Sequence, residues 1–137
     1  MIKRITRRFI KNEKGQSMVE FALVLLPLTL LLLGIIEFGW IFNGHITLTS
    51  SAREGARLAA ANEFATDGQI EEAVQRHTNG SALSNVAVIV NKGNPDPEVV
   101  ITVNGDIDPI IGFFVRNTMN LEGEATMRLE YYSGEDG

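Results

Sequence analysis

The feature that most constrains this chain is a long uncharged run near its N-terminus. Residues Phe21–Ile36 read FALVLLPLTLLLLGII, and the sequence stays apolar for several residues after Glu37. An α-helix rises 1.5 Å per residue, so the segment 21–42 reaches about 33 Å, enough to cross the hydrocarbon core of a bilayer. A soluble chain of 137 residues has too little other protein to bury such a helix. The sequence therefore predicts a single membrane span at about residues 20–42.

Charge is distributed unevenly on the two sides of this span. Residues 1–15 carry six basic side chains and one acid, a net charge of +5, which leaves −10 for the remainder of a chain of net charge −5. The positive-inside rule then places the leader in the cytoplasm and the C-terminal part outside. The leader has no aromatic residue besides Phe9 and adjoins an apolar run, so the expected neighbour is anionic membrane lipid and not nucleic acid.

A secretory signal peptide is the rival interpretation of the first 42 residues. It requires a small-x-small cleavage site directly after the apolar core, and IIEFGWIFNGH offers a poor one. We therefore expect the apolar segment to be retained.

Composition argues against an enzyme or a metalloprotein. The chain has no cysteine, and its two histidines, His45 and His77, are far apart without ligand spacing. Asp96, Asp106 and Asp108 lack the spacing of a calcium loop and suit turns. There is also no nucleophile-elbow motif and no phosphate-binding glycine loop. We expect no catalytic residue, no metal and no cofactor.

A single acid, Glu20, stands where the basic leader meets the apolar run. The helix dipole favours a carboxylate in a first turn, which would leave Glu20 simply among the lipid headgroups. That interpretation does not explain the whole arrangement KGQSMVEF, in which Gly15 and Gln16 precede Glu20 and Phe21. The arrangement resembles the prepilin leader of type IV pilins, especially of the Tad (tight adherence) or Flp pilus system. The resemblance implies that a membrane aspartic prepilin peptidase cuts between Gly15 and Gln16.

Such a cut would give Glu20 a partner. It would create a new ammonium group on Gln16 and remove the +5 leader. In an apolar bundle of helices an unpaired charge is costly, so each needs an opposite charge nearby. The resemblance implies that Glu20 of one subunit neutralises the Gln16 amine of its neighbour.

A second motif follows the span. The stretch SAREGARLAAA (Ser51–Ala61) resembles the AAREGAR segment of TadE-like proteins, and ATMRLE near the C-terminus resembles their final strand. The motif residues are Ala52, Arg53, Glu54, Gly55, Ala56 and Arg57. The small residues allow another helix or a sheet to approach closely, whereas the arginines pair either with Glu54 or with acids of the head or of a neighbouring subunit. Flp major pilins have tyrosine where Phe21 stands and are shorter, so the chain resembles a TadE-type pseudopilin or minor pilin.

The remaining pattern predicts an α+β fold. Alanine and leucine extend the long helix over residues 16–61, and TDGQIEEAVQRHTN (66–79) predicts a second, amphipathic helix with Asp67 as its N-cap. Alternating apolar residues predict a hairpin at 86–91 and 99–103 and a third strand near 124–132, with Ala125, Met127, Leu129 and Tyr131 on one face. A small antiparallel sheet would pack on the long helix. The expected parts are a basic leader (1–15), the long helix (16–61) and an extracytoplasmic head (62–137).

A short apolar run in the head has two interpretations. Ile110, Ile111, Phe113 and Phe114 are too few to cross a bilayer. They either fill the core as a crossover or form a patch that docks on a pilin, a platform protein or the outer membrane leaflet.

Two functions follow from these features. The first is a pseudopilin or minor pilin in the bacterial cytoplasmic membrane, a substrate of prepilin peptidase and a partner of other pilins, pseudopilins and the assembly platform. Such a protein either enters the fibre or stays at its base. The second is an uncleaved, membrane-anchored adaptor with a binding head. Cleavage distinguishes them, since an anchor needs neither Gly15 nor Glu20.

Overall fold

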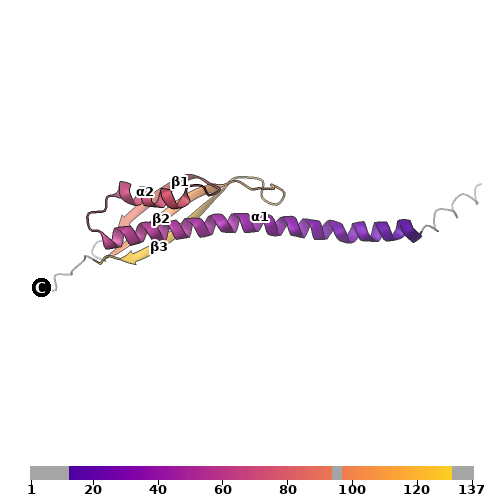
Figure 1. Cartoon of the computed structure of the whole chain (residues 1–137), viewed down its shortest axis with the longest axis horizontal. Coiled ribbons are helices and arrows are strands. Elements are labelled where there is room, and N and C mark those ends of the chain that lie inside the picture. The colour runs from indigo at the N-terminus through magenta and orange to yellow at the C-terminus, as the bar shows by residue number, and fades with distance from the viewer. Residues whose placement is uncertain (1–12, 94–96, 131–137) are drawn as a thin grey trace, which may run out of the picture. The chain divides into compact units, whose positions relative to one another are not determined.

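The longest element of the structure is a single helix. The computed structural model describes residues 13–93 and 97–130, and α1 occupies Glu13–Ala61, 49 residues, without interruption (Figure 1). The prediction of an unbroken helix over 16–61 is confirmed. Pro27 lies inside it, and the Thr29 hydroxyl donates to the carbonyl of Leu25, 2.8 Å away.

The chain divides into two compact units, Met1–Ile36 and Glu37–Gly137. In the described part of the first unit, α1 exposes its apolar side chains, such as Leu23 at 70% and Leu31 at 61%. By length and composition α1 is able to cross a membrane. Most of the basic leader, residues 1–12, lies outside the described residues.

The second unit contains an antiparallel sheet of three strands in the order β1-β2-β3. Its strands are β1 (Leu83–Lys92), β2 (Glu98–Ile107) and β3 (Met119–Arg128). The predicted hairpin is β1 and β2, with Val88 opposite Val103. The third strand begins earlier than expected, at Met119, and Tyr131 lies outside the described residues. The α+β prediction is confirmed.

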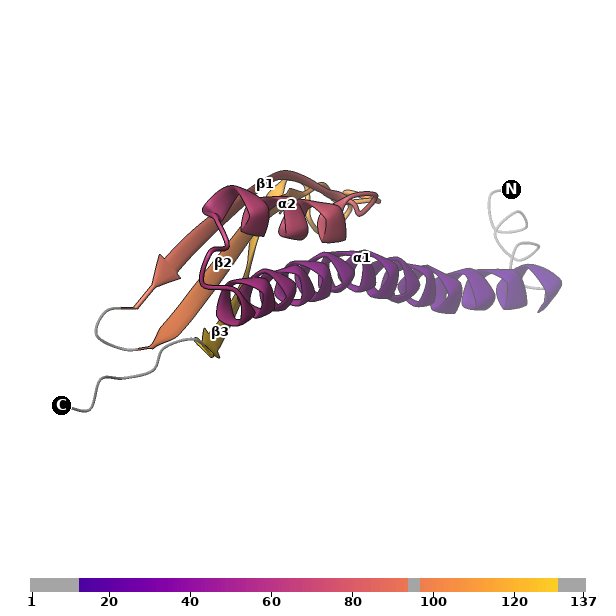
Figure 2. The same ribbon diagram turned by 60° about the vertical axis from the view of Figure 1, so that its left-hand side comes forward.

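Both helices of this unit cover the same face of the sheet, as Figure 2 shows for α1. The core combines Leu48 and small residues of α1 with alternate residues of β2, all of them buried: Ala52, Ala56, Ala59, Val99, Ile101 and Val103. Small side chains on α1 let the sheet approach its backbone, as predicted from their spacing. Met127 on β3 and Leu129 directly after it also pack into this core, as expected.

The second helix, α2, spans Asp67–Thr78. Its N-cap is Thr66, because the Thr66 hydroxyl accepts from the Gln69 amide while the Gln69 side chain accepts from the Thr66 amide. This reciprocal pair is a capping box. The prediction of Asp67 as the cap is therefore wrong by one residue.

Candidate functional site

The residues expected to direct processing lie at the N-terminal end of α1. Gly15 is half-buried, whereas Gln16, Glu20 and Phe21 are exposed. The Gln16 side-chain amide donates a hydrogen bond of 3.1 Å to a carboxylate oxygen of Glu20, one turn along. Side chains four apart on a helix face each other, so the helix alone brings Gln16 and Glu20 together.

The second motif has a packing explanation. Ala52 and Ala56 are fully buried, and a Cβ added at Gly55 would lie 2.9 Å from a methyl group of Val74. The small residues of AREGAR are therefore those over which α2 and β2 pack.

The charged residues of the same motif point to solvent. The Arg57 guanidinium donates to both Glu54 carboxylate oxygens, at 2.8 and 3.1 Å. This pairing lowers the pKa of Glu54 and raises that of Arg57. Of the two alternatives for the arginines, pairing with Glu54 is confirmed for Arg57, and Arg53 is exposed.

A buried carboxylate within the predicted span holds the loop between β2 and β3. Glu37 is 1% exposed. One of its carboxylate oxygens accepts from the Gly112 amide at 2.9 Å, and the other accepts from the Phe114 amide at 3.2 Å. Gly112 has φ +70°, a conformation that glycine adopts without strain. We call Asp108–Thr118 the β2–β3 loop and this contact the Glu37 clamp.

Two further contacts fix the base of the β2–β3 loop. The indole N–H of Trp40, nearly one turn after Glu37, donates to the Asp108 carbonyl at 3.1 Å. The Thr118 hydroxyl donates to the Asp108 carboxylate at 2.6 Å. The loop is thus tied to α1 at two places and closed on itself.

The clamp joins residues 75 and 77 positions apart, so no local pattern predicts its geometry. A signal for its existence was nevertheless present. An acid directly after sixteen uncharged residues needs a partner if it is not in water.

The apolar side chains of the β2–β3 loop are exposed. Ile110 is 54% exposed, Ile111 38%, Phe113 53% and Phe114 48%. The Phe113 and Phe114 rings make an edge-to-face contact with centroids 5.1 Å apart. The core-filling interpretation is therefore wrong for these four residues, which we call the apolar patch.

Removing the clamp should free the loop. A hydrogen bond to a charged group contributes about 1.5–3 kcal/mol, so Glu37→Leu is expected to speed amide exchange at Gly112 and Phe114 by about 30-fold or more. Hydrogen exchange of the full chain in detergent micelles measures this. Glu54→Leu is the matched control, since Glu54 lies on the same helix and pairs with the exposed Arg57 side chain. Equal exchange in both variants would contradict the clamp.

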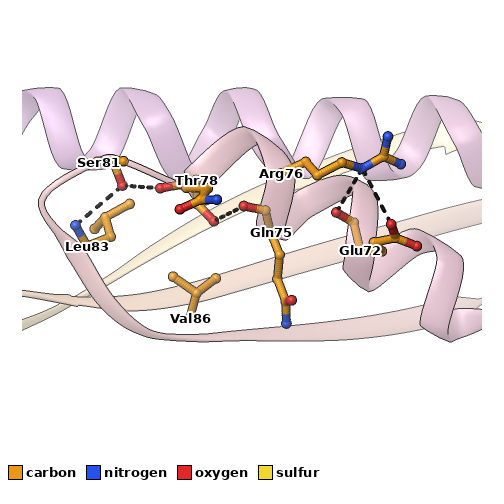
Figure 3. Close-up of a pocket in the computed structure, with 9 residues that line it drawn as sticks. Glu72, Gln75, Arg76, Thr78, Ser81, Leu83 and Val86 are labelled. Atoms are coloured by element: carbon orange, nitrogen blue, oxygen red, sulfur yellow. Dashed lines mark hydrogen bonds and ion pairs between the residues drawn. The ribbon is translucent and has the colours of Figure 1, made fainter.

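A shallow groove lies where α2 meets β1 (Figure 3). Its polar groups are used locally: Ser81 donates to the Thr78 carbonyl at 2.6 Å, and Thr78 donates to the Gln75 carbonyl at 3.2 Å. Arg76 lies 3.9 Å from Glu72 on the same helix. These contacts close the turn after α2, and they bring together no set of groups suited to catalysis.

The described residues contain no cluster of three His, Cys, Asp or Glu side chains that would hold a metal ion. Asp106 instead accepts from the side-chain amides of Asn120 and Asn85, at 2.8 and 3.0 Å. These two bonds, Asn120 first, lower the pKa of Asp106. His77 shares a hydrogen bond of 3.0 Å with Ser50. Asp96 lies outside the described residues.

The prepilin-like motif and the AREGAR motif both lie on α1. Residues 15–57 match the family model for TadE-like proteins. The TadE-like match contains both motifs, and it confirms the resemblance over this segment. It supports involvement in Tad pilus assembly, together with other pilus components. The apolar helix within it fits membrane anchoring. No curated protein and no solved structure matches the chain.

Proposed function

We propose that this chain is a TadE-like pseudopilin or minor pilin, cleaved after Gly15 and used in the assembly of an adhesive Tad (Flp-type) pilus. The observation that carries the proposal is the TadE-like match over residues 15–57. The matched segment includes Gly15, Gln16, Glu20 and Phe21, the residues that resemble a prepilin processing site.

The membrane placement follows from charge. Residues 1–15 carry +5 and stay in the cytoplasm, α1 crosses the bacterial cytoplasmic membrane at about residues 20–42, and the head of residues 62–137 lies outside. The exposed apolar side chains of α1 between Met18 and Ile36 support this placement. The same side chains would contact neighbouring helices in a fibre or at its base.

Removal of the leader prepares the chain for assembly. The cut discards the +5 charge that keeps the N-terminus at the cytoplasmic surface and leaves an ammonium group on Gln16. Glu20 of a neighbouring subunit neutralises this group. The contact of Glu20 with the Gln16 side chain is exposed and within one helix, and such pairs are weak. An intersubunit charge pair can therefore replace it.

The partners of this function are the prepilin peptidase, other pilins or pseudopilins and the assembly platform. A second function, an uncleaved membrane-anchored adaptor, is favoured by one observation, the exposed apolar patch. The two functions differ in whether Gly15 is cut.

Processing is tested by the intact mass and N-terminal sequence of the full chain, purified from cells with and without an active prepilin peptidase. We expect the chain to begin at Gln16 only when the peptidase is present. Gly15→Leu should abolish the cut, whereas Gly39→Ala, also on α1 and without neighbouring atoms within 4 Å of the added methyl, should leave it intact. A wild-type chain that still begins at Met1 beside an active peptidase would favour the anchored adaptor.

A further inference from the structure

The β2–β3 loop is the strongest unassigned feature of the molecule. We propose that its apolar patch inserts into the outer leaflet of the membrane that α1 spans, as a second membrane contact held in position by the Glu37 clamp. The inference rests on the membrane placement proposed above, but not on cleavage or on the pilus.

The clamp holds the β2–β3 loop beside the C-terminal end of the uncharged run of α1. Glu37 directly follows the uncharged run Phe21–Ile36 on the same helix. Groups bonded to its carboxylate therefore lie close to the end of this uncharged run, in the last third of the predicted span. Trp40, which holds the base of the loop through Asp108, is of the residue type that gathers at membrane interfaces. The clamp therefore keeps the loop beside the lipid surface.

The exposed side chains in the middle of the β2–β3 loop are apolar. The apolar patch puts two isoleucines and two phenylalanines, each more than a third exposed, within five consecutive residues. Over the adjoining turns α1 exposes Phe38 at 59% and Phe42 at 66%. A group of exposed apolar side chains on a folded unit marks an interaction site. A lipid leaflet is a suitable partner for these side chains. Phe38 and Phe42 belong to α1 near the end of the uncharged run, and the patch belongs to the loop that the clamp ties to α1.

The backbone of the loop has hydrogen-bond partners on α1. Non-helical backbone enters lipid only if its polar groups are satisfied within the protein. Both carboxylate oxygens of Glu37 accept loop amides, from Gly112 and Phe114, and Trp40 donates to the carbonyl of Asp108. The donors in turn balance the charge of a carboxylate that is 1% exposed. The clamp thus gives internal partners to two amide groups of the apolar part of the loop, those of Gly112 and Phe114.

Polar residues lie on both sides of the apolar patch in the sequence. Asp108 precedes it with its carboxylate bound to Thr118, and the exposed Arg116 follows it. An arginine at this position can extend its guanidinium to lipid phosphate while its stem contacts the acyl region. A short apolar tip with polar ends fits shallow insertion, because it is too short to cross the bilayer.

The test uses the absence of cysteine from the chain. Full-length Phe113→Cys is labelled with an environment-sensitive NBD fluorophore and reconstituted in phosphatidylcholine vesicles, with or without a doxyl quencher near the top of the acyl chains. Phe64→Cys is the matched control, because Phe64 is also an exposed phenylalanine of the second unit, 84% exposed in the connection after α1. Leu28→Cys, within the uncharged run, reports insertion of the span itself.

We expect the doxyl lipid to quench the label at residue 113 and not the label at residue 64. Aqueous iodide is expected to quench the label at residue 64 and not the label at residue 113. Equal iodide quenching at 113 and 64, without doxyl quenching at 113, would overturn the inference. Protection of residue 113 from both quenchers would overturn it too, since a second copy of the chain would then cover the patch. Failure of quenching at residue 28 would remove the span and the inference together. Quenching at 28 and 113 in a chain that prepilin peptidase never cuts would retain the inference and reject the proposed pilus function.

Discussion

Replacing Gly123 with alanine is expected to destabilise the second unit more than the same change at any other described glycine. A Cβ at this position would lie 2.5 Å from the Thr49 amide nitrogen and 2.6 Å from the Leu48 carbonyl carbon. Both atoms belong to the backbone of α1, so no side-chain rotation removes the clash. Overpacking usually costs 1–3 kcal/mol and sometimes more, and here we expect about 3 kcal/mol or more because β3 must move away from α1.

Denaturant unfolding of the full chain in detergent micelles measures this effect. Trp40 is the single tryptophan of the chain and lies in the second unit, so its fluorescence reports the transition. Gly68→Ala is the matched control, since a Cβ at Gly68, in the first turn of α2, meets nothing within 4 Å. That variant should be neutral or slightly more stable, because alanine favours helix over glycine. If both variants unfolded at the same denaturant concentration, the close approach of β3 to α1 would be wrong.

The importance of Gly123 illustrates what sequence patterns leave out. The alternation of Ala125, Met127 and Leu129 predicted correctly which face of β3 packs into the core. The strand begins at Met119, however, where Asn120 and Gly123 weaken the strand pattern. Glycine is needed at 123 because the backbone of α1, more than seventy positions earlier in the sequence, lies against it. No sequence pattern near Gly123 indicates this contact.

Features set by local sequence and features set by the fold also differ along the two helices. Its length and its line of small residues follow from local composition and spacing, and both were predicted. The choice of Thr66 over Asp67 as the cap of α2 depends on Gln69, which completes the capping box. The Glu37 clamp depends on the fold of a loop 75 residues away. Periodic and local features were therefore accessible from sequence, whereas contacts set by the fold were not.

The second large effect is expected at Glu20. Under the proposed function, Glu20→Ala should insert in the membrane and be cut after Gly15, but its recovery with assembled pilus components should fall by roughly a hundredfold. The reason is that breaking one partner of a buried charge pair costs about 3–5 kcal/mol, since the remaining charge stays unpaired. Under the proposed function, the charge left unpaired would be the ammonium of Gln16 on the neighbouring subunit. Crosslinking and co-purification from cells with a complete assembly system measure the recovery.

Two further variants separate charge from local structure. Glu20→Gln removes the charge but keeps a side-chain oxygen that can accept from the Gln16 amide, so it should fail as Glu20→Ala does. Glu54→Ala removes a carboxylate of the same helix whose partner, Arg57, is exposed, and it should assemble normally. Full recovery of Glu20→Gln would show that the helix-local hydrogen bond, and not the intersubunit charge pair, is what assembly needs.

The choice of Glu20 for this role is supported by a comparison of the two acids that bracket the uncharged run Phe21–Ile36. Glu37 is 1% exposed, and both of its oxygens accept amides of the β2–β3 loop within the same chain. Glu20 is exposed, and one of its oxygens accepts a side-chain amide of the adjacent turn. A carboxylate fixed by its own chain cannot serve a neighbour without opening the loop, whereas one on an exposed helix surface can. Assembly should therefore depend on the charge of Glu20, and placement of the loop on that of Glu37.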